Sequence, residues 1–241
     1  MEARIGGSAW ATLNTNTATG AFLDTILNVT MKSGDLFVRS KSNISICSTM
    51  PVNIGDLFIV AGQSNASGRG ANKQVYSHPT LKGGLFTNAY TWTDLLDWTD
   101  TTVGQIDAIS NDGGESNGSL WPIVADSIMA NYNIPVGFVP CALGGSGISA
   151  WQPGADHQNR TTLYGSMMYR INQVHGAKAV LWWQGESEAS LCVTQVFYNG
   201  LFDSFANSVF ADAGIKVMPC LLLNSPVEDS CEAKINAAIV E

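Results

Sequence analysis

Basic residues and histidines are scarce in this sequence, which has 12 lysines and arginines against 20 aspartates and glutamates, and three histidines. The formal net charge of -8 at pH 7 argues against a nucleic-acid partner, because binding a phosphate backbone needs clustered Lys and Arg. Long apolar runs are missing too, so we expect no membrane-spanning segment. No signal peptide is recognisable. The sequence therefore predicts a soluble protein, and it leaves open secretion by a leader outside these residues.

Cysteines are present, but not with the spacing of a metal site. None of the five forms a Cys-x-x-Cys pair, so we expect no metal, and nothing else in the sequence calls for a cofactor. Cys141 and Cys220 lie in apolar runs and should behave as small buried hydrophobic residues. Cys192 and Cys231 fall in polar segments that we read as loops. They could pair as a disulfide in an oxidising compartment.

The chain has enough apolar residues for a sizeable core, since 45% of it is hydrophobic and 13% charged. Residues 1–54 alternate short apolar and polar runs broken by Gly, Ser and Asn, which predicts a β-rich leader or accessory segment. Residues 55–241 alternate apolar strands with amphipathic helices, which predicts βαβ units. We therefore expect an α/β fold with three α/β/α layers around a flavodoxin-like parallel sheet. Residues 85–118 read as an inserted hairpin and loop, whose Trp92 and Trp98 either pack on the core or line a sugar pocket.

Three of the expected strands end in small or polar residues that suit acyl transfer. Their ends are followed by Ser64, Gly145 and Gln184. Because the carboxyl ends of parallel strands meet at one edge of a sheet, these residues should converge. A serine there can be a nucleophile, and a glycine N–H with a side-chain amide can hold an oxyanion. Taken alone, Ser64 is more simply explained as a turn serine or a helix cap.

The segments "GQSNASG", "ALGGSGISAW" and "LWWQGESE", in this order, resemble the first three signature blocks of the SGNH hydrolase superfamily. The match is to the branch of sialate O-acetylesterases and related acetylxylan esterases, and it covers about residues 56–241. The resemblance implies that Ser64 is the nucleophile and that the Gly145 amide and the Gln184 side chain complete an oxyanion hole. It also implies an esterase that removes O-acetyl groups from sialic acid, xylan or a surface polysaccharide through an acyl-enzyme.

Two further residues are candidates for contact with an O-acetylated glycan. Trp151 matches a tryptophan that follows the second block in this branch, and it either contacts sugar or packs as an ordinary aromatic. Glu186 stands at the same sheet edge, where we expect it to bind substrate or to orient the loops and Gln184, rather than to act as a base.

One departure from the resembling enzymes concerns the catalytic base. Their fourth block, Asp-x-x-His, is absent from this sequence, yet a serine hydroxyl needs a base within hydrogen-bond reach. His175 should cap a helix C-terminus, and His78 lies in a polar loop. His157 is either a solvated loop residue or a substitute base. The last residues, "CEAKINAAIVE", read as the start of a helix without a stop signal, so we expect a truncated chain whose base lies beyond Glu241.

Two other functions stay open at this point. The same motifs would occur in a carbohydrate-binding module of this fold with impaired catalysis. A glycosidase using Glu186 and Asp156 is a weaker alternative, because nothing fixes a suitable separation of the carboxylates. The resemblance and the β-rich leader imply an extracellular, periplasmic or virion-surface location, and oligomeric state is left undetermined.

Overall fold

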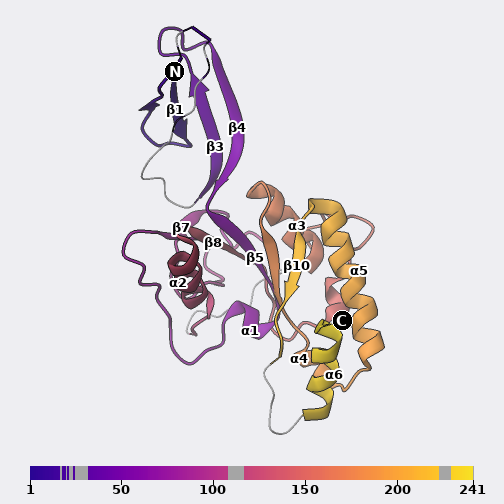
Figure 1. The fold of residues 1–241 in the computed structure, drawn as a ribbon. Coiled ribbons are helices and arrows are strands. Elements are labelled where there is room, and N and C mark those ends of the chain that lie inside the picture. The colour runs from indigo at the N-terminus through magenta and orange to yellow at the C-terminus, as the bar shows by residue number, and fades with distance from the viewer. Residues whose placement is uncertain are drawn as a thin grey trace.

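The computed structural model describes residues 1–16, 18–19, 21, 24, 32–107, 117–222 and 229–240. These residues form two separate sheets (Figure 1). The smaller one is antiparallel, has four strands in the order β2-β1-β3-β4, and projects from one end of the larger body. Its strands are β1 (Glu2–Ile5), β2 (Ala11–Thr12), β3 (Lys32–Arg39) and β4 (Cys47–Ile54). The antiparallel strands expected before residue 55 are therefore present, except for residues 26–31, which lie outside the described residues.

The larger sheet has six strands in the order β10-β9-β5-β8-β6-β7. They are β5 (Asp56–Gly62), β6 (Gly83–Phe86), β7 (Trp92–Asp94), β8 (Val136–Pro140), β9 (Ala179–Trp183) and β10 (Lys216–Pro219). All neighbouring pairs are parallel except β6 and β7. That antiparallel pair is the hairpin expected within residues 85–118, although it begins at Gly83 and extends the sheet. Residues 108–116 of the expected insert lie outside the described residues.

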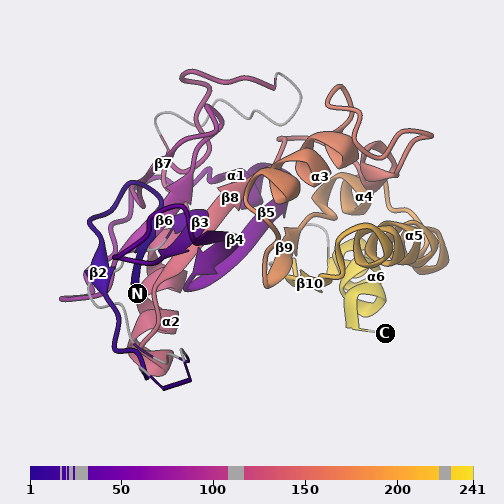
Figure 2. The same cartoon turned by 90° about the horizontal axis from the view of Figure 1, so that it is seen from above.

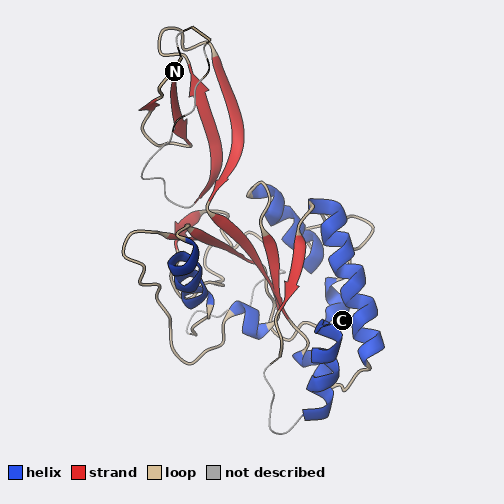
Figure 3. Ribbon diagram, in the orientation of Figure 1, coloured by secondary structure: helices blue, strands red, loops and turns tan. Residues whose placement is uncertain are grey.

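Helices cover both faces of this sheet, as Figures 2 and 3 show. They are α1 (Ser64–Ser67), α2 (Trp121–Tyr132), the 3-10 turn η1 (Ile148–Trp151), α3 (Leu163–Gln173), α4 (Glu186–Ser190), α5 (Gln195–Ala213) and α6 (Asp229–Val240). Polar caps set two of the helix starts: the hydroxyls of Thr162 and Thr194 accept bonds from Gly165 N (3.0 Å) and Phe197 N (3.2 Å). Such caps satisfy N–H groups that have no partner inside the helix.

Alternation along the strands divides the core between the two faces. Ile59 and Val180 point into the cluster that contains α3 and α5 residues, whereas Phe58 and Val60 point into the cluster under α2. Period-two alternation with both faces buried is the pattern of a parallel sheet between helices. The expected three-layer α/β/α architecture is confirmed. None of the described helices is long and apolar enough to cross a membrane.

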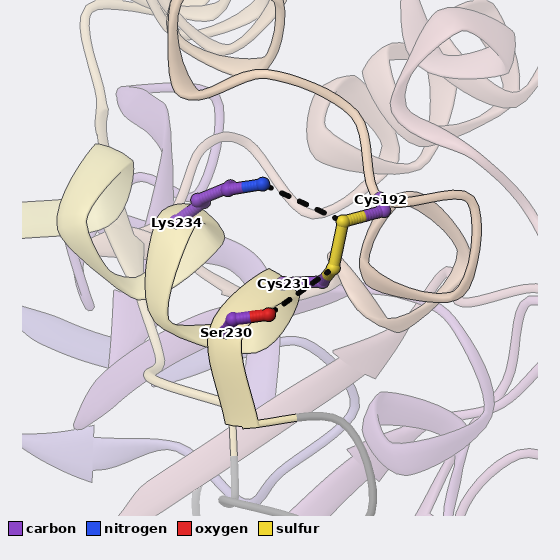
Figure 4. Close-up of a disulfide and its surroundings, with 4 residues drawn as sticks. All are labelled: Cys192, Ser230, Cys231 and Lys234. Carbon is purple, nitrogen blue, oxygen red and sulfur yellow. Dashed lines mark hydrogen bonds between the residues drawn. A yellow bond between two sulfur atoms is a disulfide. The ribbon is translucent and has the colours of Figure 1, made fainter.

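A disulfide joins Cys192, just after α4, to Cys231 in the first turn of α6 (Figure 4), with their Cα atoms 5.0 Å apart. The expected pairing is therefore present, but Cys231 lies in a helix rather than in a loop. Cys141 is fully buried, as expected, whereas Cys220 is only partly buried.

Candidate active site

The carboxyl ends of three adjacent parallel strands, β9, β5 and β8, form one edge of the sheet. Gln63 N donates to Trp183 O (3.0 Å), and Leu143 N donates to Gly62 O (3.0 Å). The backbones approach so closely that a Cβ on Gly62 would lie 2.0 Å from Trp183 O. The segments carrying Ser64, Gly145 and Gln184 thus meet, as expected from the sequence. In Figure 1 this edge, with α1 and α4, faces away from the N-terminal sheet.

Ser64 is the first residue of α1 and is partly exposed. Neither its hydroxyl nor its backbone N–H makes a hydrogen bond to any residue that the structure describes. By contrast, the hydroxyl of Ser146, another serine at this edge, is buried and donates to Leu143 O (2.8 Å). Of these two serines, Ser64 is the one whose hydroxyl is not engaged by a described residue.

Gly145 is exposed at the same edge, and its backbone has φ of +71°. No atom lies within 4 Å of the position that a Cβ would take. Its N–H has no hydrogen-bond acceptor among the described residues, while its carbonyl accepts from Ser187 Oγ (3.3 Å). The Gly145 amide is thus a donor that no described residue engages.

Gln184 is fully buried, and its side-chain amide is already bonded to protein. Nε2 donates to Ser146 O (3.2 Å) and to a carboxylate oxygen of Glu188, and Oε1 accepts from the Tyr198 hydroxyl (3.1 Å). An amide nitrogen carries two hydrogens. Gln184 therefore stabilises this edge of the sheet through its hydrogen bonds. It can donate to an oxyanion only by giving up one of them.

Glu188 is a residue of this site whose role sequence reasoning missed. It is 5% exposed, and besides the Gln184 amide it accepts from Ile148 N (2.7 Å). One buried carboxylate thus ties the segment after β8 to the segment after β9. The helical spacing rule could not have found this contact, because Gln184 precedes α4 and Gly185 between them has a φ of +140°.

Glu186, expected to contact substrate or orient loops, contacts the residue after the candidate nucleophile. Asn65 Nδ2 donates to Glu186 Oε1 (2.5 Å), whereas Oε2 is buried and has no partner among the described residues. Burial raises the pKa of the Glu186 carboxyl. Repulsion from Glu188 and Glu232 raises this pKa further, whereas the hydrogen bond from Asn65 lowers it. The orienting role has direct support from these contacts.

Trp151 has no exposed surface. Its indole packs edge-on against Trp182 at a centroid distance of 5.2 Å, and Nε1 donates to Ser146 Oγ (3.0 Å). Of the two alternatives for Trp151, the structure therefore shows an ordinary packed aromatic. Its burial contradicts the expected contact with sugar, because a ligand cannot reach the ring.

The histidines lie away from Ser64. His157 Nδ1 is 2.6 Å from Asp212 Oδ2, in the last turn of α5. Because α5 follows α4 and returns to the start of β10, its last turn lies at the opposite edge of the sheet. These contacts give no support to His157 as a substitute base, or to a carboxylate pair of Glu186 with the neighbouring Asp156.

The other two histidines have structural settings. His175 has φ of +60° directly beyond α3, so it ends that helix in the left-handed conformation. His78 Nδ1 accepts from Leu81 N (3.0 Å), and its own backbone N–H donates to Asp126 in the middle of α2 (2.9 Å). Within the described residues no group of three His, Cys, Asp or Glu side chains could hold a metal.

A pocket of about 320 Å³ adjoins this edge, beginning at Asn65 and Trp183. Its remaining walls come from the loop after α1 and the first turn of α2. Trp92 and Trp98 are not among its described lining residues. Trp92 instead packs on Phe86 (5.4 Å between centroids), and Lys73 Nζ lies over the Trp98 ring (3.3 Å to its centroid). Packing on the core is observed for Trp92, whereas for Trp98 only the contact with Lys73 is observed.

Comparisons with known proteins identify the family of this chain. Residues 54–238 match the family model described as carbohydrate esterase, sialic acid-specific acetylesterase. A protein of Arabidopsis thaliana named as a probable carbohydrate esterase is 24% identical over 191 residues, which span 71% of this chain and 69% of the relative.

Two solved structures show the fold. An Arabidopsis thaliana protein has a TM-score of 0.57 and 21% identity, over 77% of this chain and 80% of its own. A carbohydrate acetylesterase from Xanthomonas citri has a TM-score of 0.56 and 21% identity, over 98% of this chain and 58% of its own. Since the family model spans most of the sequence and the fold agrees, the chain belongs to the sialic acid-specific acetylesterase family of carbohydrate esterases.

Proposed function

We propose that this protein is a serine esterase that removes O-acetyl groups from carbohydrate through an acyl-enzyme on Ser64. The observation that carries the proposal is the free hydroxyl of Ser64 at the same sheet edge as two unengaged backbone donors, the N–H groups of Ser64 and Gly145. Donors fixed where negative charge develops are the main requirement for stabilising a tetrahedral intermediate. Membership in a family of carbohydrate esterases supports an acetylated sugar as the substrate.

In the first step Ser64 Oγ attacks the acetyl carbonyl carbon, and its proton passes to a base. The oxyanion accepts bonds from the N–H groups of Ser64 and Gly145, and from Gln184 if its amide exchanges one of its present acceptors. The bond between the acetyl carbon and the sugar oxygen then breaks, the sugar oxygen takes the proton from the base, and Ser64 carries the acetyl group. Water then attacks this ester, which releases acetate and restores the serine.

No histidine is identified as the general base of this scheme. Asp-x-x-His is absent from the sequence, and the contacts of His78, His157 and His175 place them away from Ser64. We therefore expect slow turnover by these 241 residues. Oxyanion stabilisation and binding alone still leave roughly 10³–10⁴-fold acceleration over water in serine hydrolases that lack triad members.

Family membership supports the proposed substrate, and the disulfide supports the proposed location. We propose an O-acetylated glycan, with sialic acid, xylan and surface polysaccharide as the candidate carriers of the acetyl group. An extracellular, periplasmic or virion-surface site of action is supported by the Cys192–Cys231 disulfide, because such bonds persist in oxidising surroundings.

An acetate-release assay on O-acetylated sialic acid, acetylated xylan and 4-nitrophenyl acetate tests the proposal. Ser64→Ala should remove the release, while Ser146→Ala, which loses a buried hydroxyl at the same edge, should retain it if the fold survives. A serine-directed phosphonate should label Ser64. Labelling of Ser146, or equal rates for Ser64→Ala and the unmodified protein, would overturn the assignment.

A further inference from the structure

The pocket beside Ser64 lies on the α2 side of the sheet edge. Asn65, the residue after the candidate nucleophile, and Trp183, the residue before Gln184, form the wall nearest the site. Asn72, Gln74 and Ser119 add polar side chains on the other side. The pocket therefore opens beside the acyl site without being made of the oxyanion donors.

One carboxylate holds the two loops of this pocket together. Asp97 Oδ2 accepts from Gln74 N (2.6 Å) and from Ser119 N (2.9 Å), and Oδ1 accepts from Ser119 Oγ (2.7 Å). Bonds of this kind to an ionised group are stronger than neutral ones. The loop after α1 and the turn before α2 are thus fixed relative to each other.

Backbone pairing reinforces this connection. Gly70 and Gly118 exchange two hydrogen bonds (2.9 and 2.8 Å). A Cβ on Gly118 would lie 1.7 Å from Asn72 O, so only glycine permits the approach. The indole Nε1 of Trp121 donates to Ala66 O (2.7 Å), which anchors α2 to α1. The pocket is therefore preformed, and a preformed site loses less entropy when it binds a ligand.

The lining has the composition that a sugar ring requires. An indole offers a broad apolar face to the C–H groups of a pyranose, and amide side chains can donate and accept at the same time. Asn65, Asn72 and Gln74 supply the amides, and Trp183 supplies the indole. The indole N–H of Trp183 is buried and has no acceptor among the described residues.

We infer that this pocket binds a pyranose ring of the acetylated carbohydrate and thereby selects glycan esters over small acetyl esters. The inference rests on the proposed function, because it places the sugar beside the acetyl group that Ser64 attacks. Asn72 and Gln74 are the specificity-determining residues, and Trp183 is the stacking platform.

The test separates glycan binding from ester chemistry. Asn72→Ala and Gln74→Ala remove side-chain amides while keeping the backbone groups that Asp97 and Gly118 contact. Each should raise KM for O-acetylated sialic acid or an acetylated xylo-oligosaccharide about 2–10-fold, the worth of one net hydrogen bond. Neither should change kcat/KM for 4-nitrophenyl acetate, which has no sugar. Asn131→Ala, an exposed amide on α2 outside the pocket, is the matched control.

A direct binding measurement keeps the inference independent of turnover. Calorimetric titration of the Ser64→Ala protein with each acetylated sugar should show binding that Asn72→Ala and Gln74→Ala weaken and Asn131→Ala does not. Unchanged binding and KM in both pocket variants would overturn the sugar site, even if Ser64 proves to be the nucleophile. Absence of ester hydrolysis together with pocket-dependent sugar binding would overturn the esterase proposal and leave the pocket standing.

Discussion

Asn65 donates a hydrogen bond from Nδ2 to Glu186 Oε1 (2.5 Å), which links the residue after Ser64 to the first residue of α4. The two residues are 121 positions apart in the chain. This bond ties the turn that carries the candidate nucleophile to the turn that follows Gln184. The Glu186 carboxyl is therefore bonded to the residue that follows the candidate nucleophile, and its second oxygen is buried without a partner among the described residues.

The first prediction concerns the pH dependence of stability at Glu186. Burial raises its pKa in the folded protein above the unfolded value, so the folded state holds the proton more tightly. The stability that this contributes is complete below the unfolded pKa, about 4.3, and is lost as the pH rises through the higher folded pKa. The unmodified protein should therefore lose more stability than Glu186→Gln between pH 4 and pH 7.

Urea unfolding of both proteins at several pH values in this range measures the effect. Glu2→Gln serves as the control, because Glu2 pairs with Arg39 in the N-terminal sheet, outside the catalytic edge. Parallel pH profiles for Glu186→Gln and the unmodified protein would show that the Glu186 carboxyl is not perturbed by burial.

The second prediction concerns Gln184. If its amide exchanges an acceptor for the oxyanion, Gln184→Ala should lower kcat by about 10²–10³ with a smaller effect on KM. Steady-state hydrolysis of 4-nitrophenyl acetate provides the measurement. Gln152→Ala is a matched control, since it also removes an amide bonded to backbone carbonyls, those of Ile148 and Leu201. An unchanged kcat in Gln184→Ala would restrict Gln184 to bracing Glu188 and Ser146.

The third prediction is that His157→Ala leaves catalysis intact. Its partner Asp212 lies at the end of α5, across the sheet from Ser64. The pair is partly exposed, so its loss should cost at most about 1 kcal/mol of unfolding free energy. Rates for 4-nitrophenyl acetate should match those of the unmodified protein. A tenfold loss of kcat in a folded His157→Ala protein would restore this histidine as a base.

The sequence was sufficient for the sheet edge, because the signals there are local. A buried strand followed by small residues marks a carboxyl end, and parallel topology then brings Ser64, Gly145 and Gln184 together. The direction in which a side chain leaves such an edge is not local. Trp151 turns inward onto Trp182 and Phe205, which come from β9 and α5, so its burial depends on packing between distant segments.

The same reason explains the misplaced histidine and the missed pocket. The loop after η1 carries His157 away to Asp212, 55 residues further along the chain. The pocket depends on Asp97, which binds Gln74 and Ser119 from two separate loops. No periodicity or motif encodes either contact, since both arise only when the loops are packed.

The last prediction is that the Cys192–Cys231 disulfide holds α6 against the site. One turn beyond Cys231, Ile235 is fully buried beside the turn after Gln184, where a Cβ on Gly185 would lie 2.6 Å from its Cγ2 atom. The bond closes a separation of 39 residues, for which chain entropy gives roughly 3–4 kcal/mol of stabilisation. Lys234 Nζ lies 3.5 Å from Cys192 Sγ (Figure 4).

A paired Cys192→Ala and Cys231→Ala variant should therefore unfold at lower urea concentration than the unmodified protein, by an amount that matches the effect of dithiothreitol on the latter. Dithiothreitol should have no effect on the variant itself. Cys47→Ser, which alters an exposed free cysteine, should leave the transition unchanged. Mass spectrometry that finds both thiols free in protein purified without reductant would contradict the pairing. Equal urea midpoints with and without the bond would instead show that packing of Ile235 on Gly185 is enough to hold α6.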